Sequence, residues 1–178
     1  MGNKYAGFVG LVVLASAAGV GLKAVGAPPN IEMLMPFVLA AGLAGGPLYG
    51  LALGGCVRGL YDVYQGWAGP WTLLTAPSYA VVGLVVGFAG LRWKVRSRTG
   101  MMALAGAATL VYDVLTMALF GLWMGMPLQV LVVGQVPFSI MHVAGNMLFC
   151  FLLAPTLTGA VRELVFEESA VAPVVVKG

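Results

Sequence analysis

Charged side chains are scarce in this sequence: Asp, Glu, Lys and Arg together make up 8% of the 178 residues, against about 25% in typical soluble domains. With 61% hydrophobic residues, the chain lacks the polar surface that a soluble domain needs. Histidine occurs once and cysteine twice, which is too few for a His/Cys metal cluster or a disulfide framework. The net charge of +3 is concentrated in one loop, so it reports membrane orientation and excludes nucleic acid as a partner.

Long apolar stretches are what the sequence has in abundance. A helix that crosses a bilayer needs roughly 20 mainly apolar residues, and the candidate stretches are 6–22, 33–57, 63–91 and 114–161. They follow one another with short joints, so residues 1–178 are expected to form one membrane domain. Glycine, with 26 occurrences, is common where membrane helices pack closely. We therefore predict an all-α integral membrane protein in the cell membrane.

Pro, Gly and polar residues divide these stretches into predicted crossings. Asn30 is expected to cap the second helix, with Glu32 in its first turn. Gly45-Gly46-Pro47 separates the second helix from the third. A cleavable signal peptide is an alternative for the first helix, but the apolar run continues past Ala15-Ser16-Ala17 to Leu22. The six predicted crossings are 5–25, 31–44, 47–65, 73–91, 100–123 and 133–157, followed by a cytoplasmic tail, 158–178.

The basic residues predict which ends of these helices face the cytoplasm. The dense cluster Arg92–Arg98 joins the fourth and fifth crossings, and cytoplasmic loops carry an excess of Lys and Arg. Six crossings with the N-terminus inside place Lys4, this cluster and Arg162 on the cytoplasmic side, leaving only Lys23 outside. Both termini are therefore predicted to be cytoplasmic.

Ionisable residues inside crossings are costly and mark functional sites. Arg58 and Asp62 lie four residues apart on the third helix, so they are expected to pair, either as a ligand site or as a structural pair. Asp113 has no basic residue within a turn or two on its own helix, which makes Arg58 its expected partner. His142 and Asn146 are also four apart. We expect His142 to bridge helices rather than bind a metal, and Asn146 can serve as interhelical contact.

Polar and aromatic groups gather toward one end of the predicted bundle. The third helix runs outward and the sixth runs inward, so their polar residues share the outer half, while the inner halves are almost purely apolar. This asymmetry predicts a cavity open to the outside. Arg58 would hold an anionic or carbonyl group, Asp62 or Asp113 would accept hydrogen bonds, and Trp67, Trp71 or Trp123 would stack on a ring. The predicted substrate-binding residues are Glu32, Arg58, Tyr61, Asp62, Trp71, Asp113, His142 and Asn146.

Two local patterns resemble a known family. One runs from Met35-Pro36-Phe37 through Gly45–Gly50 into Gly59-Leu60-Tyr61-Asp62. The other joins Val136-Pro137-Phe138 to His142–Asn146 and ends with Leu153-Ala154-Pro155. In spacing, placement and chain size, the sequence resembles the substrate-binding S components of energy-coupling factor (ECF) vitamin transporters, from the first crossing to about Thr158.

This resemblance implies a six-helix bundle that captures a vitamin or related micronutrient near the outer face. It also implies partners: a transmembrane T subunit and two cytoplasmic ATPases, which supply energy as the S component topples. Family members often dock through an Ala-x-x-x-Ala motif on the first helix. Residues 15–19 only approximate that motif, so Ala15, Ala18 and Gly19 are the expected docking residues, with packing inside this chain as the alternative. Metal-specific members have an early His that is lacking here, so an organic substrate is expected.

Two other classes of function are open alternatives. An intramembrane enzyme could use His142 and Asp113 as acid and base, but the sequence offers no nucleophile constellation or metal cluster. A small channel or carrier would need polar groups through the inner half, and no inverted repeat is apparent. The sequence has no Gly-x-x-x-x-Gly-Lys-Ser/Thr loop, so ATP hydrolysis by that route is excluded. We predict no catalytic residue, no metal and no cofactor.

Overall fold

The chain folds into helices alone wherever its structure is described. A computed structural model describes residues 2–28 and 30–163, and these residues form no β-strand. The predicted tail lies beyond residue 163 for most of its length, outside the described residues. The helices are α1 (Gly2–Ala24), α2 (Met35–Gly45), α3 (Pro47–Tyr64), α4 (Thr72–Trp93), α5 (Arg98–Met124) and α6 (Leu128–Val161).

Four of these helices are long and apolar enough to cross a membrane. They are α1, which contributes the 20 residues Tyr5–Ala24, α4 with 22 residues, α5 with 27 and α6 with 34. Roughly 20 residues are enough for one crossing. The other two differ: α2 has 11 residues, and α3 carries Arg58 and Asp62. The chain is thus an all-helical protein with the helix lengths of a membrane protein, as the apolar runs predicted.

The start of α2 corrects the sequence prediction. The helix begins at Met35, not at residue 31, and Asn30 does not cap it. Glu32 lies in the non-helical segment before the helix rather than in its first turn. Pro36 explains the difference: at the sixth position of a helix starting at residue 31 it would leave the carbonyl of Glu32 without a donor, whereas the first turn tolerates proline.

The Gly45-Gly46-Pro47 break is confirmed. Gly46 has φ +81° and ends α2, a backbone conformation that glycine adopts without the steric penalty of a side chain. Pro47 then occupies the first turn of α3, where its missing N–H costs nothing. Helices α2 and α3 therefore form a tight hairpin.

Helix α6 is longer than predicted at both ends. It begins at Leu128, directly after Pro127, and continues through Pro137 and Pro155 to Val161. Pro155 cannot donate to the carbonyl four residues earlier, which is Phe151. Arg98 Nη1 donates to that carbonyl oxygen at 3.1 Å. The guanidinium group thus replaces the missing donor, and the helix continues past the proline.

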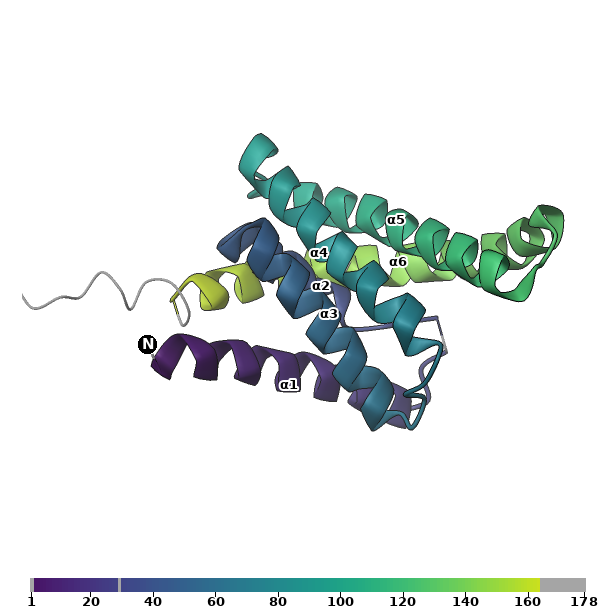
Figure 1. Cartoon of the computed structure of the whole chain (residues 1–178). Coiled ribbons are helices and arrows are strands. Elements are labelled where there is room, and N and C mark those ends of the chain that lie inside the picture. The colour runs from purple at the N-terminus through teal and green to yellow at the C-terminus, as the bar shows by residue number, and fades with distance from the viewer. Residues whose placement is uncertain (1, 29, 164–178) are drawn as a thin grey trace, which may run out of the picture.

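Helix α2 lies inside the bundle, and α3 packs beside it toward the surface (Figure 1). Helix α2 is buried from Met35 to Gly42 and packs against α3, α4, α5 and α6. Helices α5 and α6 form a second, longer hairpin, and α1 packs on α3. The core is therefore built around the shortest helix.

Glycines set the contact between α3 and α4. A Cβ added to Gly83 would overlap the carbonyl oxygen of Gly50, and one added to Gly54 would overlap the carbonyl oxygen of Tyr79. Gly50 and Gly54 are four apart, as are Gly83 and Gly87, the small-residue spacing that lets membrane helices approach to backbone contact.

The bundle has two chemically different ends. The N-terminus of α1, the α2–α3 turn and the C-terminal ends of α4 and α6 lie together at the left of Figure 1, with Arg92, Lys94, Arg96, Arg98 and Arg162 at this end. The opposite end holds the C-terminus of α1 and the α3–α4 and α5–α6 turns. The buried carboxylates of the described residues are Glu32 before α2, Asp62 in the last turn of α3 and Asp113 near the middle of α5, so none of them lies at the basic end.

Candidate functional site

Arg58 lies at the centre of a buried ion-pair cluster. Its Nη1 is 3.0 Å and 3.2 Å from the two carboxylate oxygens of Glu32, and its Nε is 3.1 Å from Asp62 Oδ1. The Arg58–Asp62 pairing predicted from their four-residue spacing is confirmed. The Glu32 contact was not predicted, and it ties the segment before α2 to α3. One guanidinium group thus faces two carboxylates.

Hydroxyl groups from α4 complete this cluster. Thr75 Oγ1 donates to Asp62 Oδ2 at 3.0 Å, and the Tyr79 hydroxyl donates to Glu32 Oε2 at 3.3 Å. The Arg58 Cζ atom also lies 5.4 Å from the centre of the Tyr61 ring, within reach of a cation–π interaction. The charges are therefore paired and held in one geometry, as buried charges must be.

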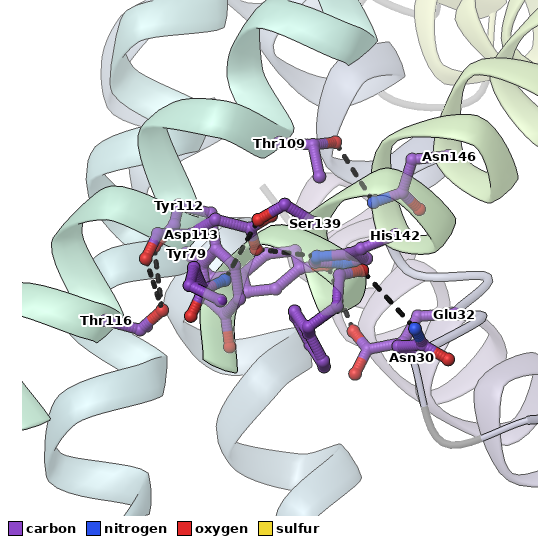
Figure 2. A network of polar contacts seen from close by, with 12 residues as sticks. Asn30, Glu32, Tyr79, Thr109, Tyr112, Asp113, Thr116, Ser139, His142 and Asn146 are labelled. Atoms are coloured by element: carbon purple, nitrogen blue, oxygen red, sulfur yellow. Dashed lines mark hydrogen bonds and ion pairs between the residues drawn. The ribbon is translucent and has the colours of Figure 1, made fainter. Parts of the chain in front are cut away.

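A second polar cluster joins α5 to α6 (Figure 2). Asp113 Oδ1 is 2.7 Å from His142 Nδ1, and Ser139 donates to Asp113 Oδ2 at 2.6 Å. Gln135 Nε2 in turn donates to Ser139 Oγ at 3.0 Å. His142 bridges the two helices, as expected. The predicted Arg58–Asp113 pairing is wrong: Asp113 lies on the face of α5 that packs against α6, whereas α3 packs mainly against α1, α2 and α4.

Asn146 adds a third link between α5 and α6. Its Nδ2 donates to Thr109 Oγ1 at 3.1 Å, as Figure 2 shows. Two buried atoms on the same face of α6, His142 Nε2 and Asn146 Oδ1, have no hydrogen-bond partner. Buried polar atoms are nearly always paired, so these two atoms are exceptions to that rule.

A cavity of about 420 Å³ opens beside both clusters, within the range of small-molecule sites. Its walls come from the segment before α2, from α3, from the α3–α4 turn and from the α5–α6 hairpin. The lining residues are Glu32, Arg58, Trp67, Trp71, Tyr112, Thr116, Met117, Phe120, Met126, Val130, Leu131, Gly134, Gln135 and Phe138.

The predicted substrate-binding residues divide into two sets around this cavity. Glu32, Arg58 and Trp71 line it. The other five are buried and do not line it: Tyr61, Asp62, Asp113, His142 and Asn146. Trp67 lines the cavity as well, whereas Trp123 does not.

Most of the α5–α6 wall was missed by the sequence prediction. Met117, Phe120 and Leu131 are indistinguishable from lipid-facing residues in an apolar run. Gln135 had a usable signal, because residues 135, 139, 142 and 146 recur at helical spacing and form one polar stripe on α6. Thr109 and Thr116 repeat that pattern on α5, three residues on either side of the 112–113 pair.

The docking residues predicted on α1 lie partly inside this chain. Ala15 is fully buried, and a Cβ on Gly19 would contact Leu34 and Tyr61. Ser16, between them, donates to the Val57 carbonyl oxygen at 3.1 Å. Ala18 is half-buried against the core. Packing within the chain, the alternative considered for these residues, thus accounts for Ala15 and Gly19.

The described residues hold no group of three His, Cys, Asp or Glu side chains that could bind a metal ion. Comparisons with protein-family models, curated proteins and solved structures find no match to this chain. Function is therefore inferred from the cavity and the groups that line it.

Proposed function

We propose that this chain is the substrate-capture subunit of an ECF-type transporter that imports a small organic micronutrient across the cell membrane. In this proposal the chain crosses the membrane six times with both termini in the cytoplasm. A transmembrane T subunit and two cytoplasmic ATPases would supply the energy. The observation that carries the proposal is the 420 Å³ cavity, which lies at the end of the bundle opposite the basic α4–α5 joint.

The positive-inside rule gives this cavity an orientation. Arg92, Lys94, Arg96 and Arg98 lie around the α4–α5 joint, at the end of the bundle far from the cavity. If that end faces the cytoplasm, the cavity opens outward, where a capture subunit meets its substrate.

The short helix α2 supports a binding role. Its 11 residues span about 16 Å at 1.5 Å per residue, roughly half of a 30 Å hydrocarbon layer. The non-helical segment before it would complete the crossing. Irregular backbone is tolerated at membrane depth only where it is buried in protein or lines a cavity, and Glu32 from this segment is buried and lines the cavity.

The position of His142 favours binding over catalysis. Its pairing with Asp113 at 2.7 Å has the geometry of a base with its orienting carboxylate. However, His142 is 1% exposed and stands behind the cavity wall rather than in the lining. A channel is disfavoured too, because the lining residues all belong to one end of the bundle.

Mass spectrometry of small molecules released from the detergent-purified protein tests the proposal. We expect a near-stoichiometric organic compound in the wild type, retained in Trp93→Ala and lost or depleted in Trp71→Ala. These two tryptophans are both exposed but lie at opposite ends. A protein that releases no compound, and that no member of a vitamin panel stabilises thermally, would refute substrate capture.

A further inference from the structure

The hydrogen bonds behind the cavity wall have a fixed direction. A carboxylate only accepts hydrogen bonds, so the short Ser139–Asp113 contact of 2.6 Å uses the single hydroxyl hydrogen of Ser139. Ser139 Oγ then has only lone pairs to offer Gln135, which must present its NH₂ group at 3.0 Å. The amide carbonyl oxygen of Gln135 and its second N–H are left for the cavity that this residue lines.

Thr116 and Glu32 present acceptors to the cavity for similar reasons. The Thr116 hydroxyl donates to the Tyr112 carbonyl oxygen at 2.9 Å, which leaves only its lone pairs for a ligand. Glu32 is a carboxylate. Arg58 donates to Glu32 through Nη1 and turns its Nε toward Asp62, and the indole N–H groups of Trp67 and Trp71 are further donors in the lining. The acceptors that Glu32, Gln135 and Thr116 offer thus stand beside these donors.

The ion pairs beside the cavity also favour a cation. Two carboxylates, Glu32 and Asp62, share the single guanidinium group of Arg58. These three side chains together carry a charge of −1. Because Arg58 is shared by two carboxylates, an anion placed beside it would meet their repulsion as well as its attraction.

Aromatic rings form much of the remaining wall. Trp67, Trp71, Tyr112, Phe120 and Phe138 all line the cavity. The faces of such rings attract cations, and their area suits a planar ligand. Acceptors, a negative charge balance and aromatic faces all favour the same class of ligand.

We propose that the cavity selects a positively charged, ring-bearing small molecule whose N–H groups donate to Glu32, Gln135 and Thr116, and that it rejects carboxylates and phosphates. This inference rests on the proposed capture function and reverses the sequence-based role of Arg58 as an anion-binding residue. Arg58 instead holds Glu32 in place as an acceptor.

Fluorescence quenching tests the charge of the cavity without knowledge of the ligand. In a Trp93→Phe/Trp123→Phe background, the emission comes from Trp67 and Trp71, because the chain has four tryptophans. Quenching by Cs⁺ and by iodide is measured at equal ionic strength, with N-acetyltryptophanamide in the same detergent as reference. We expect a Cs⁺-to-iodide ratio about two- to threefold above the reference. Glu32→Gln should lower the ratio, and Glu163→Gln, at the far end of α6, should not.

The outcomes separate this inference from the proposed function. A ratio at or below the reference, or a released compound that is anionic at neutral pH, overturns the ligand class while substrate capture stands. A ratio above the reference together with a released cation supports both proposals. A high ratio in a protein that releases nothing and binds no vitamin supports the cavity charge and contradicts capture. Because the ratio of the Trp93→Phe/Trp123→Phe protein with Glu32 intact decides the sign of the charge, the test does not depend on the folding of Glu32→Gln.

Discussion

Gly83 of α4 and Gly50 of α3 approach so closely that a Cβ on either would overlap the carbonyl oxygen of the other. Both partners of this contact are backbone, so no side-chain rotation can relieve an added methyl group. The two helices must separate instead, which would disturb Tyr79 and the Glu32 carboxylate to which it donates. The glycine contact therefore supports the site as well as the fold.

Gly83→Ala is accordingly expected to destabilise the protein by about 3 kcal/mol, at the upper end of overpacking costs. Thermal unfolding in detergent, followed by circular dichroism, measures the effect. Gly10→Ala is the matched control, because a Cβ at Gly10 has nothing within 4 Å. Equal melting temperatures for the two variants would contradict the backbone contact.

Removing Arg58 should be more damaging than removing the whole ionic cluster. Arg58→Met leaves the Glu32 and Asp62 carboxylates buried without their cation. We expect this to lower the free energy of unfolding by about 3–5 kcal/mol. The triple variant Arg58→Met/Glu32→Gln/Asp62→Asn should recover about half or more of that loss, since no uncompensated charge remains. Melting temperatures in detergent compare the two. A triple variant less stable than the single one would show that the pairing itself provides net stability.

His142 and Asn146 of α6 each carry a buried polar atom without a hydrogen-bond partner, but replacing them should change the stability of the protein by different amounts. Asn146→Leu is expected to cost at most about 1 kcal/mol, because Thr109 retains its bond to the Ala105 carbonyl oxygen at 2.8 Å. His142→Leu should cost about 3 kcal/mol, because it leaves the buried Asp113 carboxylate without its ring partner. Similar losses of melting temperature for both substitutions would argue against an ionic Asp113–His142 pair.

Trp71→Ala is expected to weaken binding of the retained ligand about five- to tenfold, equivalent to roughly 1–1.4 kcal/mol of stacking. Trp71 lines the cavity and its ring also meets the Phe120 ring edge-on, at 5.5 Å between centres. Titration of the ligand-free protein with the identified compound measures the change. Trp93→Ala should leave the affinity unchanged, and an equal loss in both variants would place the ligand elsewhere.

Local chemistry was readable from the sequence, and contacts between helices were not. The α2–α3 break depends on Gly46 and Pro47 alone, and the Arg58–Asp62 pair depends on one helix turn, so both were predicted. The partner of Asp113 depends on which face of α5 meets α6. Periodicity places Asp113 on a polar face but does not identify the helix opposite, and Arg58 was chosen wrongly.

The same limit applies to the cavity. Its charged and tryptophan residues stand out in an apolar chain, so Glu32, Arg58 and Trp71 were predicted. Phe120 and Leu131 line the cavity only because the α5–α6 hairpin folds over the segment before α2. Their side chains are chemically the same as those of residues that face lipid.

The burial of α2 also dictates an order of events in biosynthesis. The chain leaves the ribosome from its N-terminus, so α2 emerges when only α1 precedes it, yet α4, α5 and α6 complete its surroundings. A helix of 11 residues is too short to rest in the bilayer as an independent crossing. Until α6 has been synthesised, α2 must shelter against α3 or within the insertion machinery. The cavity, which needs Glu32 on one side and the α5–α6 hairpin on the other, is thus among the last features of the protein to form.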